Sequence, residues 1–538
     1  MICQKIKNLI EKSVQKLQKE RVLPGVEMPE IQVEHSEEKI HGDYATNIAM
    51  TITKEIKKNP MDIAYRVVEE LKNLKTERFF EKIEVAKPGF INFFLSKEYL
   101  QKQVGEILKQ GKKFGRLKIG RNRKIQVEFI SANPTGPLHI GNGRGAFFGD
   151  TLANVLEWAG YKTVREYYIN DAKVNTQIKT LGQTALGKGV VYLNDYLKSR
   201  ITKLKEKLEK ISNPGKAGYL LAQEVQKDIK NFIKNKLRIK FDSWISEEDL
   251  YQKNKIKKIY HWLKKKGLIY EKEEAEWLKI SEFGAPKDEV VVRQNGEPTY
   301  FLSDIAYHKD KFDRGFKKII NIWGADHQGH VPKIKAIAKI LNYKGDLNIL
   351  ICQLVRLKKG KISKRKGEIV TLEELIDEVG LDVARFFYLT KSLNAQMEFD
   401  LELAKEQSEK NPIYYVQYAH ARICSIFKKS KKSKMESAKG KTRVKNLKLL
   451  NHPSELTLIK QLIRFPEIIE DSAKDYQLQR IPQYLLDLAK NFHQFYRDCK
   501  VISENKDLME ARLSLILATK IVLKKTLSLI GISAPERM

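Results

Sequence analysis

Residues 124–169 carry the pattern that most restricts the fold of this chain. The run KIQVEFI (124–130) has the composition of a short strand, the turn sequence PTGP follows it, and helical spacing begins at Gly143. A second strand-like run, KTVREYYI, covers residues 162–169. Strand, loop, helix and strand within about forty-five residues form a βαβ unit. We therefore expect an α/β fold, a parallel sheet with helices on both faces that binds ligands at the carboxyl ends of its strands.

The rest of the chain divides around this unit. Residues 1–112 begin with apolar side chains at helical spacing and end with a strand-turn-strand pattern, which predicts an α+β domain. We expect the parallel-sheet domain at residues 113–404, with a helical insertion at about 190–285. Helical periodicity without strand signals predicts an all-α domain at residues 405–538.

Two strand-like runs follow the insertion, and we expect both to continue the parallel sheet. They are EVVVRQ at 289–294 and KKIINIWGAD at 317–326. A polar, basic tract of low complexity at 428–448 predicts a loop between helices.

The charge balance favours a polyanionic partner. Lys and Arg number 100 against 67 Asp and Glu, a formal net charge of +33. A solvated lysine-rich surface, as in heat-stable proteins, is the alternative explanation.

Cysteine usage and hydropathy indicate the compartment. The four cysteines lie far apart without a CxxC pair, so we expect neither a zinc site nor a disulfide framework. No apolar stretch reaches the ~20 residues that a membrane span needs. We expect a cytoplasmic protein that does not enter a membrane.

The segment PLHIGNGRG (137–145) is a candidate phosphate site. His139 lies between the predicted strand and helix, where its imidazole and the amides of the first helical turn can meet phosphate oxygens. Nearby glycines allow close approach of the backbone, and Arg144 adds positive charge. A purely structural histidine is the alternative.

A second basic motif, KISKRKG (361–367), could close over a triphosphate. Its lysines would stabilise charge on departing pyrophosphate, although most basic loops are simply solvated. The chain contains no GxxxxGK[ST] motif, which disfavours kinase-type phosphoryl transfer. Attack at the α-phosphate, which is adenylation, remains.

Taken together, SANPTGPLHIGNGRG and KISKRKG resemble the HIGH and KMSKS signatures of class I aminoacyl-tRNA synthetases. Within that class the chain resembles the arginyl-tRNA synthetases. The further strings that carry this resemblance are REYYINDA, FDSWISEE, PTYFLSDIAYHKDKFDRGF, WGADHQGHV, DVARFFYL, NPIYYVQYAHARICSI and the final SAPERM. The resemblance implies a class I Rossmann-like catalytic domain, an α+β N-terminal domain that contacts the tRNA elbow, and an α-helical, DALR-type anticodon-binding domain.

The resemblance also implies an arginine pocket. Its residues would be Glu128, Asn133, Tyr300, Asp304 and Gln328. A guanidinium is a planar fork of donors that favours carboxylates on two edges, which two acids from different segments would supply. An ordinary surface acid is the alternative for the first of these residues.

For ATP the resemblance implies two groups of residues. The catalytic group would be His139, Asn142, Lys361 and Lys364, and the ATP-binding group would be Gly141, Gly324, Asp326, His327 and Ser363. A helix N-cap is a second possible role for the aspartate in WGADH.

Two positions depart from the family signatures. Asn142 replaces the second histidine of HIGH, and KMSKS reads KISKR. An asparagine amide still donates hydrogen bonds, so we expect weaker dependence on that contact and an active protein.

The C-terminal domain offers candidate tRNA contacts. Tyr414, Tyr418 and Arg422 alternate aromatic and cationic character along one predicted helix, a pattern suited to stacking on unpaired bases. Core packing explains the tyrosines equally well. The partners implied are tRNA(Arg), L-arginine and ATP as a substrate with Mg²⁺, and we expect a monomer without zinc.

Two other functions remain open. The first is a different adenylyl-transferring enzyme with an HxGH-type loop, although such enzymes are usually shorter. The second is a non-catalytic tRNA-binding relative, which only Asn142 favours.

Overall fold

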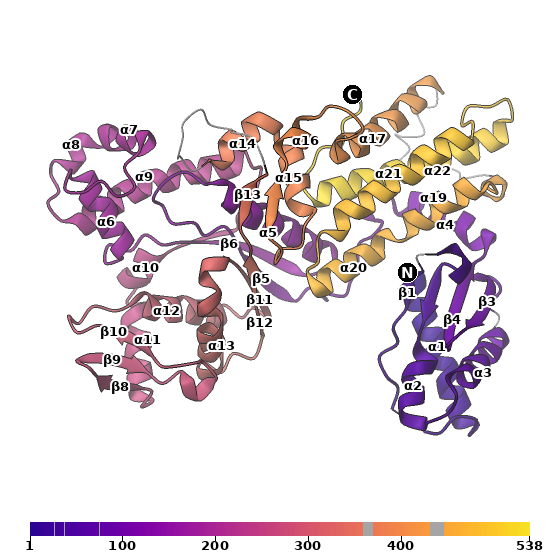
Figure 1. Ribbon diagram of the computed structural model, residues 1–538, viewed down its shortest axis with the longest axis horizontal. Coiled ribbons are helices and arrows are strands. Elements are labelled where there is room, and N and C mark those ends of the chain that lie inside the picture. The colour runs from indigo at the N-terminus through magenta and orange to yellow at the C-terminus, as the bar shows by residue number, and fades with distance from the viewer. Residues whose placement is uncertain (26, 37, 75, 359–369, 431–445) are drawn as a thin grey trace.

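A five-stranded parallel sheet forms the centre of the computed structural model, which describes residues 1–25, 27–36, 38–74, 76–358, 370–430 and 446–538 (Figure 1). Its strands are β5 (Lys124–Glu128), β6 (Lys162–Ile169), β7 (Ser243–Ser246), β11 (Lys318–Gly324) and β12 (Asp346–Cys352). Their spatial order is β12-β11-β5-β6-β7, and each neighbouring pair is parallel. The order reverses between β5 and β11, so this is a doubly wound, Rossmann-like sheet with its crevice beside those two strands. The expected fold class is confirmed.

Helices connect the strands of this sheet. α5 (Ile140–Trp158) joins β5 to β6, α12 (Tyr300–Asp313) precedes β11, and α13 (Val331–Ile340) with the 3₁₀ segment η4 (Ala325–His330) joins β11 to β12. α5 packs closely on the loop after β5, because a Cβ on Gly149 would lie 2.3 Å from Phe129 Cγ. This close approach fixes the start of α5 above the carboxyl end of β5.

The segment between β6 and α12 contains more than helices. Its helices are α6 (Thr176–Ala185), α7 (Asp195–Lys203), α8 (Lys205–Leu208), α9 (Pro214–Asn235), α10 (Glu247–Gln252) and α11 (Lys255–Lys265). Its strands β8 (Ile269–Lys272), β9 (Ala275–Leu278) and β10 (Glu289–Val292) form an antiparallel sheet in the order β10-β9-β8, with the turn η3 (Ser281–Phe283) before β10.

Two expectations for this segment are wrong. The stretch 190–285 is not purely helical, since β7 lies inside it and forms an edge of the main sheet. The run at 289–294 does not continue the parallel sheet, because β10 pairs antiparallel with β9. The strand at 317–326 does belong to the main sheet, as expected.

The N-terminal part is an α+β unit, as predicted. Its elements are α1 (Ile2–Lys19), β1 (Glu34–His35), η1 (Lys39–His41), β2 (Tyr44–Thr46), α2 (Ile48–Ile56), α3 (Pro60–Asn73), β3 (Phe80–Ala86), β4 (Phe90–Leu95), α4 (Lys97–Gln110) and η2 (Gly111–Lys113). The strand order is β1-β2-β4-β3, antiparallel throughout. Ile6, Ile10 and Val14, which share the predicted apolar face of α1, are buried.

The C-terminal part is helical after a short two-stranded sheet. β13 (Val355–Leu357) pairs with β14 (Met397–Phe399), and α14 (Leu372–Val379) and α15 (Leu381–Leu389) lie between them in the chain. The later elements are α16 (Leu401–Lys405), α17 (Pro412–Lys429), η5 (Leu447–Leu449), α19 (Pro453–Ile463), α20 (Phe465–Asp475), α21 (Arg480–Asp498) and α22 (Lys506–Leu529). Most of the basic tract 428–448 lies outside the described residues.

The N-terminal unit is attached to the C-terminal helices, and α4 packs on α19 and α22 (Figure 1). Glu467 of α20 is largely buried and accepts hydrogen bonds from the hydroxyl of Tyr44 and the backbone N–H of Cys3. Its second carboxylate oxygen lies 2.7 Å from His35 Nε2. One buried acid of the C-terminal domain therefore collects three groups of the N-terminal unit.

Among the described residues, no helix combines the length and the apolar character needed to cross a membrane.

Candidate active site

The loop that follows β5 has an unusual backbone. Ile130 and Ser131 have φ values of 67° and 40°, in the left-handed region that side-chain-bearing residues rarely occupy. Hydrogen bonds hold them there: Tyr168 N donates to Ser131 Oγ (3.1 Å), and the Tyr167 hydroxyl donates to Ala132 O (3.1 Å). The loop is thus fixed at the point where the strand order reverses.

His139 caps α5. Its Nδ1 accepts a hydrogen bond from Gly141 N (3.1 Å), so in the neutral ring the proton is on Nε2. Partial desolvation lowers the pKa of His139, and the Asp326 carboxylate opposes this effect. The imidazole is therefore neutral, and its Nε2–H can donate a hydrogen bond at the N-terminus of α5. This arrangement is suited to binding phosphate oxygens.

Asn142 completes the cap. Its Oδ1 accepts from His139 N (2.9 Å), which together with the His139 contact forms a capping box. The residue that departs from the HIGH signature therefore has a structural role, and its amide group still carries two donors.

The residues just after the second basic motif pair with this cap. Ile140 N donates to Val370 O (3.2 Å), Leu372 N donates to Leu138 O (2.8 Å), and His139 lies opposite Thr371 in an antiparallel bridge. The predicted residues Lys361, Ser363 and Lys364 lie outside the described residues. The described residues that follow the motif, from Val370 onward, lie directly beside the phosphate-binding candidate.

Arg144 does not contribute to a phosphate site, contrary to the prediction. Its buried guanidinium donates to the backbone oxygens of Ser392 (2.5 Å) and Ala395 (2.8 Å). The helical turn directs this side chain to the segment between α15 and β14, away from the start of α5.

The end of β11 supplies the opposite side of the crevice. Gly324 ends the strand, and Asp326, His327 and Gln328 of η4 are exposed. Asp326 Oδ2 lies 3.4 Å from His327 Nε2. η4 and α13 start without a side-chain cap, so the alternative N-cap role of Asp326 is not found. These side chains are available to a ligand that bridges β5 and β11.

Two acids that lie close together, Asp304 in the second turn of α12 and Glu247 at the start of α10, form the candidate acid pocket. Burial and the nearby carboxylates of Glu247 and Glu128 raise the pKa of Asp304 to about 8, and Lys311 partly opposes them. Glu247 is 3% exposed, burial raises its pKa, and its carboxylate accepts from Asn175 Nδ2 (3.1 Å). The two carboxyl groups are thus close enough for Glu247 to raise the pKa of Asp304, and a bound guanidinium would relieve this crowding of negative charge.

Glu128 is not a free carboxylate. Its Oε2 is ion-paired with Lys311 and accepts from the Tyr307 hydroxyl (3.3 Å). Lys311 also donates to Asn321 Oδ1 (2.8 Å), which ties α12 to β5 and β11. Glu128 therefore already has a cationic partner, and Glu247 is a further acid close to Asp304.

Two other predicted arginine ligands have protein partners. The Tyr300 hydroxyl accepts from Thr176 N (2.7 Å) and donates to Asn175 Oδ1 (3.3 Å) at the start of α6. Asn133 Oδ1 accepts from Asn170 Nδ2 (2.8 Å). Both side chains thus connect the pocket rim to the loop after β6.

The predicted tRNA-binding residues lie on α17. Arg422 donates to the Tyr418 hydroxyl (2.6 Å) and stacks over the Tyr418 and Tyr496 rings at 4.9 Å. Tyr418 is 37% exposed and Tyr414 is half-buried. The neighbouring His420 is fully buried.

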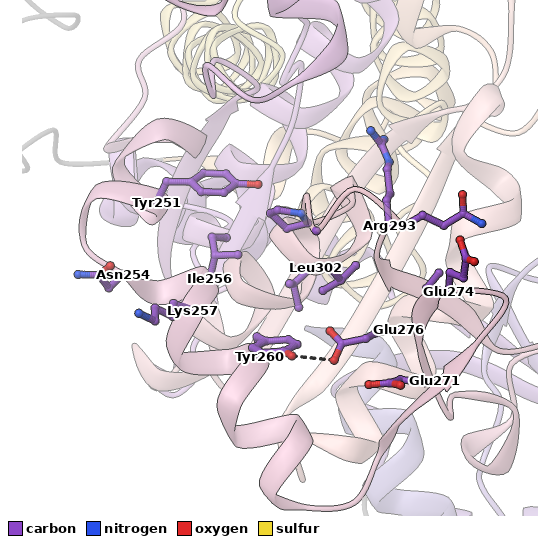
Figure 2. Close-up of a pocket in the computed structure, with 15 residues that line it drawn as sticks. Tyr251, Asn254, Ile256, Lys257, Tyr260, Glu271, Glu274, Glu276, Arg293 and Leu302 are labelled. Carbon is purple, nitrogen blue, oxygen red and sulfur yellow. Dashed lines mark hydrogen bonds between the residues drawn. The ribbon is translucent and has the colours of Figure 1, made fainter.

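A separate cavity of about 700 Å³ lies beside the small antiparallel sheet (Figure 2). Figure 2 shows Glu276 facing Tyr260, which donates to it at 2.8 Å, with Tyr251 and Arg293 at the rim. The cavity contains none of the predicted site residues. Within the described ranges, no group of three or more His, Cys, Asp or Glu side chains is arranged to hold a metal ion.

Comparison with protein families accounts for nearly the whole chain. Residues 4–95 match the family described as arginyl tRNA synthetase N terminal domain, residues 103–423 the catalytic domain of class I (R) tRNA synthetases, and residues 416–538 the DALR anticodon binding domain.

Individual relatives agree. An arginine–tRNA ligase from Carboxydothermus hydrogenoformans is 42% identical, with 94% of each chain covered, and one from Caldanaerobacter subterraneus is 41% identical, with 99% of this chain and 98% of that protein covered. The solved arginyl-tRNA synthetase of Thermus thermophilus has the same fold, with a TM-score of 0.78, 21% identity and complete coverage of both chains. That of Plasmodium falciparum gives a TM-score of 0.77 at 20% identity, covering 100% of this chain and 99% of that chain. The chain belongs to the arginyl-tRNA synthetase family of class I aminoacyl-tRNA synthetases.

Proposed function

We propose that this enzyme activates L-arginine with ATP and transfers it to tRNA(Arg), and that both steps occur at the crevice between β5 and β11. The observation that carries the proposal is the neutral His139 cap of α5, which follows β5, together with Asp304, whose carboxyl group lies close to those of Glu247 and of Glu128 at the end of β5. A hydrogen-bond donor for an anion and a pair of acids for a cation, on neighbouring elements, suit a triphosphate and a guanidinium as substrates.

The first step is adenylation. An oxygen of the arginine carboxylate attacks the α-phosphorus of ATP, the bond to the β-phosphate oxygen breaks, and pyrophosphate leaves with Mg²⁺. His139 Nε2–H and the first amides of α5 stabilise the negative charge that builds on the phosphate oxygens. Lys361 and Lys364 are proposed to act on the departing pyrophosphate, on the basis of the family motif.

ATP is proposed to lie across the reversal point of the sheet. Gly141 and Asn142 would contact the phosphates from β5, and Gly324, Asp326 and His327 would contact the ribose and base from β11. Ser363 completes this set from the sequence motif. The exposed η4 side chains and the capped α5 face one crevice, which supports this placement.

Arginine is proposed to place its guanidinium between Asp304 and Glu247. Tyr300, which is 39% exposed, and Gln328 would contact the substrate at the pocket rim, and Asn133 lies on the loop between the pocket and His139. Glu128 would contact the substrate through Oε1, because its hydrogen bonds with Tyr307 and Lys311 are both made by Oε2.

The second step is transfer to tRNA. A hydroxyl of the terminal ribose attacks the carbonyl carbon of the adenylate, and AMP leaves. We propose that α17, with Tyr414, Tyr418 and Arg422, contacts the anticodon region, while residues 1–112 contact the tRNA elbow and residues 113–404 hold the reaction centre. The net charge of +33 supports binding along a nucleic-acid backbone.

The proposal also covers the oligomeric state, the location and the metal content of the enzyme. The enzyme is proposed to act as a cytoplasmic monomer that takes ATP with Mg²⁺ and carries no zinc. Gel filtration at working concentration tests the monomer, and metal analysis of the purified protein tests the absence of zinc.

One assay separates this function from the alternatives. The protein is incubated with ATP, total tRNA and each amino acid in turn, and label that becomes acid-precipitable is counted. Arginine alone should be incorporated. Incorporation of another amino acid would contradict the arginine assignment, and no incorporation with any amino acid would point to a non-catalytic relative, which the family match does not favour.

A further inference from the structure

Two sequence strings that resemble the family, DVARFFYL and the final SAPERM, have no role in the site described above. The structure brings them together on α15. Asp382 Oδ2 accepts hydrogen bonds from Ser533 Oγ, from Ser533 N (3.2 Å) and from Gln417 Nε2 of α17 (2.9 Å). The segment after α22 and the helix with the candidate anticodon contacts are thus held by one carboxylate.

One helical turn later, Arg385 connects three parts of the chain. Its Nη1 donates to Asp150 Oδ2 of α5 (2.8 Å) and to Ile530 O (3.3 Å), and its Nη2 donates to Leu237 O after α9 (2.7 Å). The guanidinium fills the space beside Gly531, where a Cβ would lie 2.2 Å from Nη1. The end of α22 therefore contacts the middle of α5 through a fully buried charge.

The last turn of α15 reaches the first turn of α5. The Tyr388 hydroxyl donates to Ile140 O (2.7 Å), and Ile140 directly follows the cap residue His139. A Cβ on Gly143 would lie 3.0 Å from Tyr388 Cζ, so the two helices are in close contact there. α15 thus contacts α5 at its start and its middle.

We propose that α15 is a positioning element, through which the docking of the C-terminal segment on Asp382 sets the position of the His139 cap. The helix has nine residues, and its contacts with the C-terminal segment and with α5 come from Asp382, Arg385 and Tyr388, which lie on one face at a spacing of three. A displacement of the C-terminal segment must therefore move the first turn of α5, where the phosphate donors lie. Asp382, Arg385 and Tyr388 act on the reaction through His139 and do not touch substrate. This inference rests on the proposed adenylation at His139.

The test uses the full chain and two substitutions, each of which removes one side-chain hydroxyl. Tyr388→Phe removes the contact with Ile140 O, and Ser533→Ala removes the hydroxyl contact with Asp382. Arginine-dependent exchange between ATP and pyrophosphate is measured with saturating tRNA, alongside the KM for ATP and arginine, the Kd for tRNA and the Tm. Tyr388→Phe should lower kcat about three- to tenfold with KM values within about twofold, and Ser533→Ala should lower kcat about twofold or more.

Matched controls exclude a general loss of structure. Tyr484→Phe removes another buried tyrosine hydroxyl that donates to a backbone oxygen, that of Gln461, and Ser454→Ala removes another serine–aspartate contact, with Asp498. Both controls lie in the C-terminal helices away from α15 and should keep the parent kcat, even if their Tm falls as much as that of the test variants.

The double variant Tyr388→Phe/Ser533→Ala decides whether the two contacts belong to one route. Its loss in kcat should equal the larger single loss and fall short of the product of the two, because both changes interrupt the same element. The proposal is overturned if the two losses multiply, if Tyr388→Phe keeps the parent kcat, or if only the Kd for tRNA changes. A parent protein without arginine-dependent exchange would instead contradict the proposed function.

Discussion

If Asp304 binds the guanidinium as proposed, the arginine affinity depends on pH. In the free pocket its pKa is raised to about 8 by burial, Glu247 and Glu128. A bound guanidinium favours the charged carboxylate, so the pKa must fall in the complex, and below pH 8 binding must expel a proton. The KM for arginine should therefore decrease as pH rises towards 8, by up to about tenfold per unit, and level off above it. Exchange kinetics across this range provide the measurement.

A neutral variant supplies the control for this pH effect. Asp304→Asn should bind arginine more weakly at every pH and should show no such slope, because the amide does not titrate. A parent KM that stays constant below pH 8, or an unchanged KM in the variant, would remove Asp304 from the guanidinium pocket.

Asn142 has a structural role in the cap of α5, and substitution tests whether it also has the proposed role in the reaction. Asn142→Ala removes the acceptor for His139 N, which should cost about 0.5–2 kcal/mol of unfolding free energy in urea titration. Exchange should also slow, because the cap that orients His139 is lost. Asn142→His should stay within about tenfold of the parent rate. A rate many orders of magnitude higher would show that asparagine impairs the enzyme.

At the level of single residues, the sequence predicts the role of a side chain when that role depends on local structure alone. His139 could be found because a change from strand to helical spacing, with glycines around it, marks a phosphate turn. Glu247 could not, because its burial depends on β7 joining the edge of the sheet. The expectation that Arg144 adds charge to the phosphate site is wrong because its partners lie far away in the sequence. Only the fold shows that the segment after α15 packs on the face of α5 that carries this side chain.

At the level of the elements, Gly143 of α5 lies where the neighbouring helices leave no room for a side chain. A Cβ on Gly143 would lie 2.8 Å from Leu372 Cδ1 and 3.0 Å from Tyr388 Cζ, whereas a Cβ on Gly145 has its nearest neighbour, Cys352 Sγ, at 3.9 Å. Gly143→Ala should lower the unfolding free energy by about 1–3 kcal/mol and slow exchange, because it separates α5 from α14 and α15. Urea titration measures the first effect.

The matched variant on the same helix is Gly145→Ala. It should be neutral or stabilise the protein by up to about 1 kcal/mol, since alanine favours a helix interior over glycine. If both variants lost the same stability, the cause would be the helix itself and the packing argument would fail.

Which strands pair is the part of the fold that local sequence does not contain. β5, β6 and β11 have apolar runs long enough to be recognised, and their parallel pairing follows from the intervening helices. EVVV at β10 is equally apolar, but its partner is β9, and a four-residue run does not specify a partner. SWIS at β7 is short and half polar, so it could not be recognised, and β12 was not predicted either.

For the whole molecule, Glu467 joins the first and last domains. Glu467→Gln removes the charge that faces His35 and weakens the contacts with Tyr44 and Cys3. Amide hydrogen exchange in β1 and β2 should become faster, because the N-terminal unit opens more often from the helices. The Kd for tRNA should increase if both domains bind the same molecule.

The neighbouring Glu470 provides a control for this change. It pairs with Lys474 within α20, at 2.7 Å, and it acts on Cys3 of the N-terminal unit through its charge, as one of several contributions that raise the pKa of that thiol. Glu470→Gln should leave exchange in β1 and β2 unchanged. Equal acceleration in both variants would indicate loosening of α20 and not release of the domain.

Binding of tRNA should also show the effect of net charge. The logarithm of the affinity should fall linearly with the logarithm of salt concentration, by about 0.7–0.9 for each phosphate contacted. Filter binding at several salt concentrations gives this slope. Arg422→Gln should reduce the slope by the amount that corresponds to about one phosphate contact if Arg422 binds the tRNA backbone. The slope should stay unchanged if Arg422 contacts bases only.

The two chain ends have a practical consequence for labelling. Cys3 N is bound to Glu467, and Ser533 is bound to Asp382, so both ends are attached to the C-terminal half of the molecule. A fluorophore or fusion partner next to Cys3 or Ser533 would disturb these contacts. The turn before α7 is a better place, since Val190 is 77% exposed there and a dye at that position leaves the contacts of Glu467 and Asp382 intact.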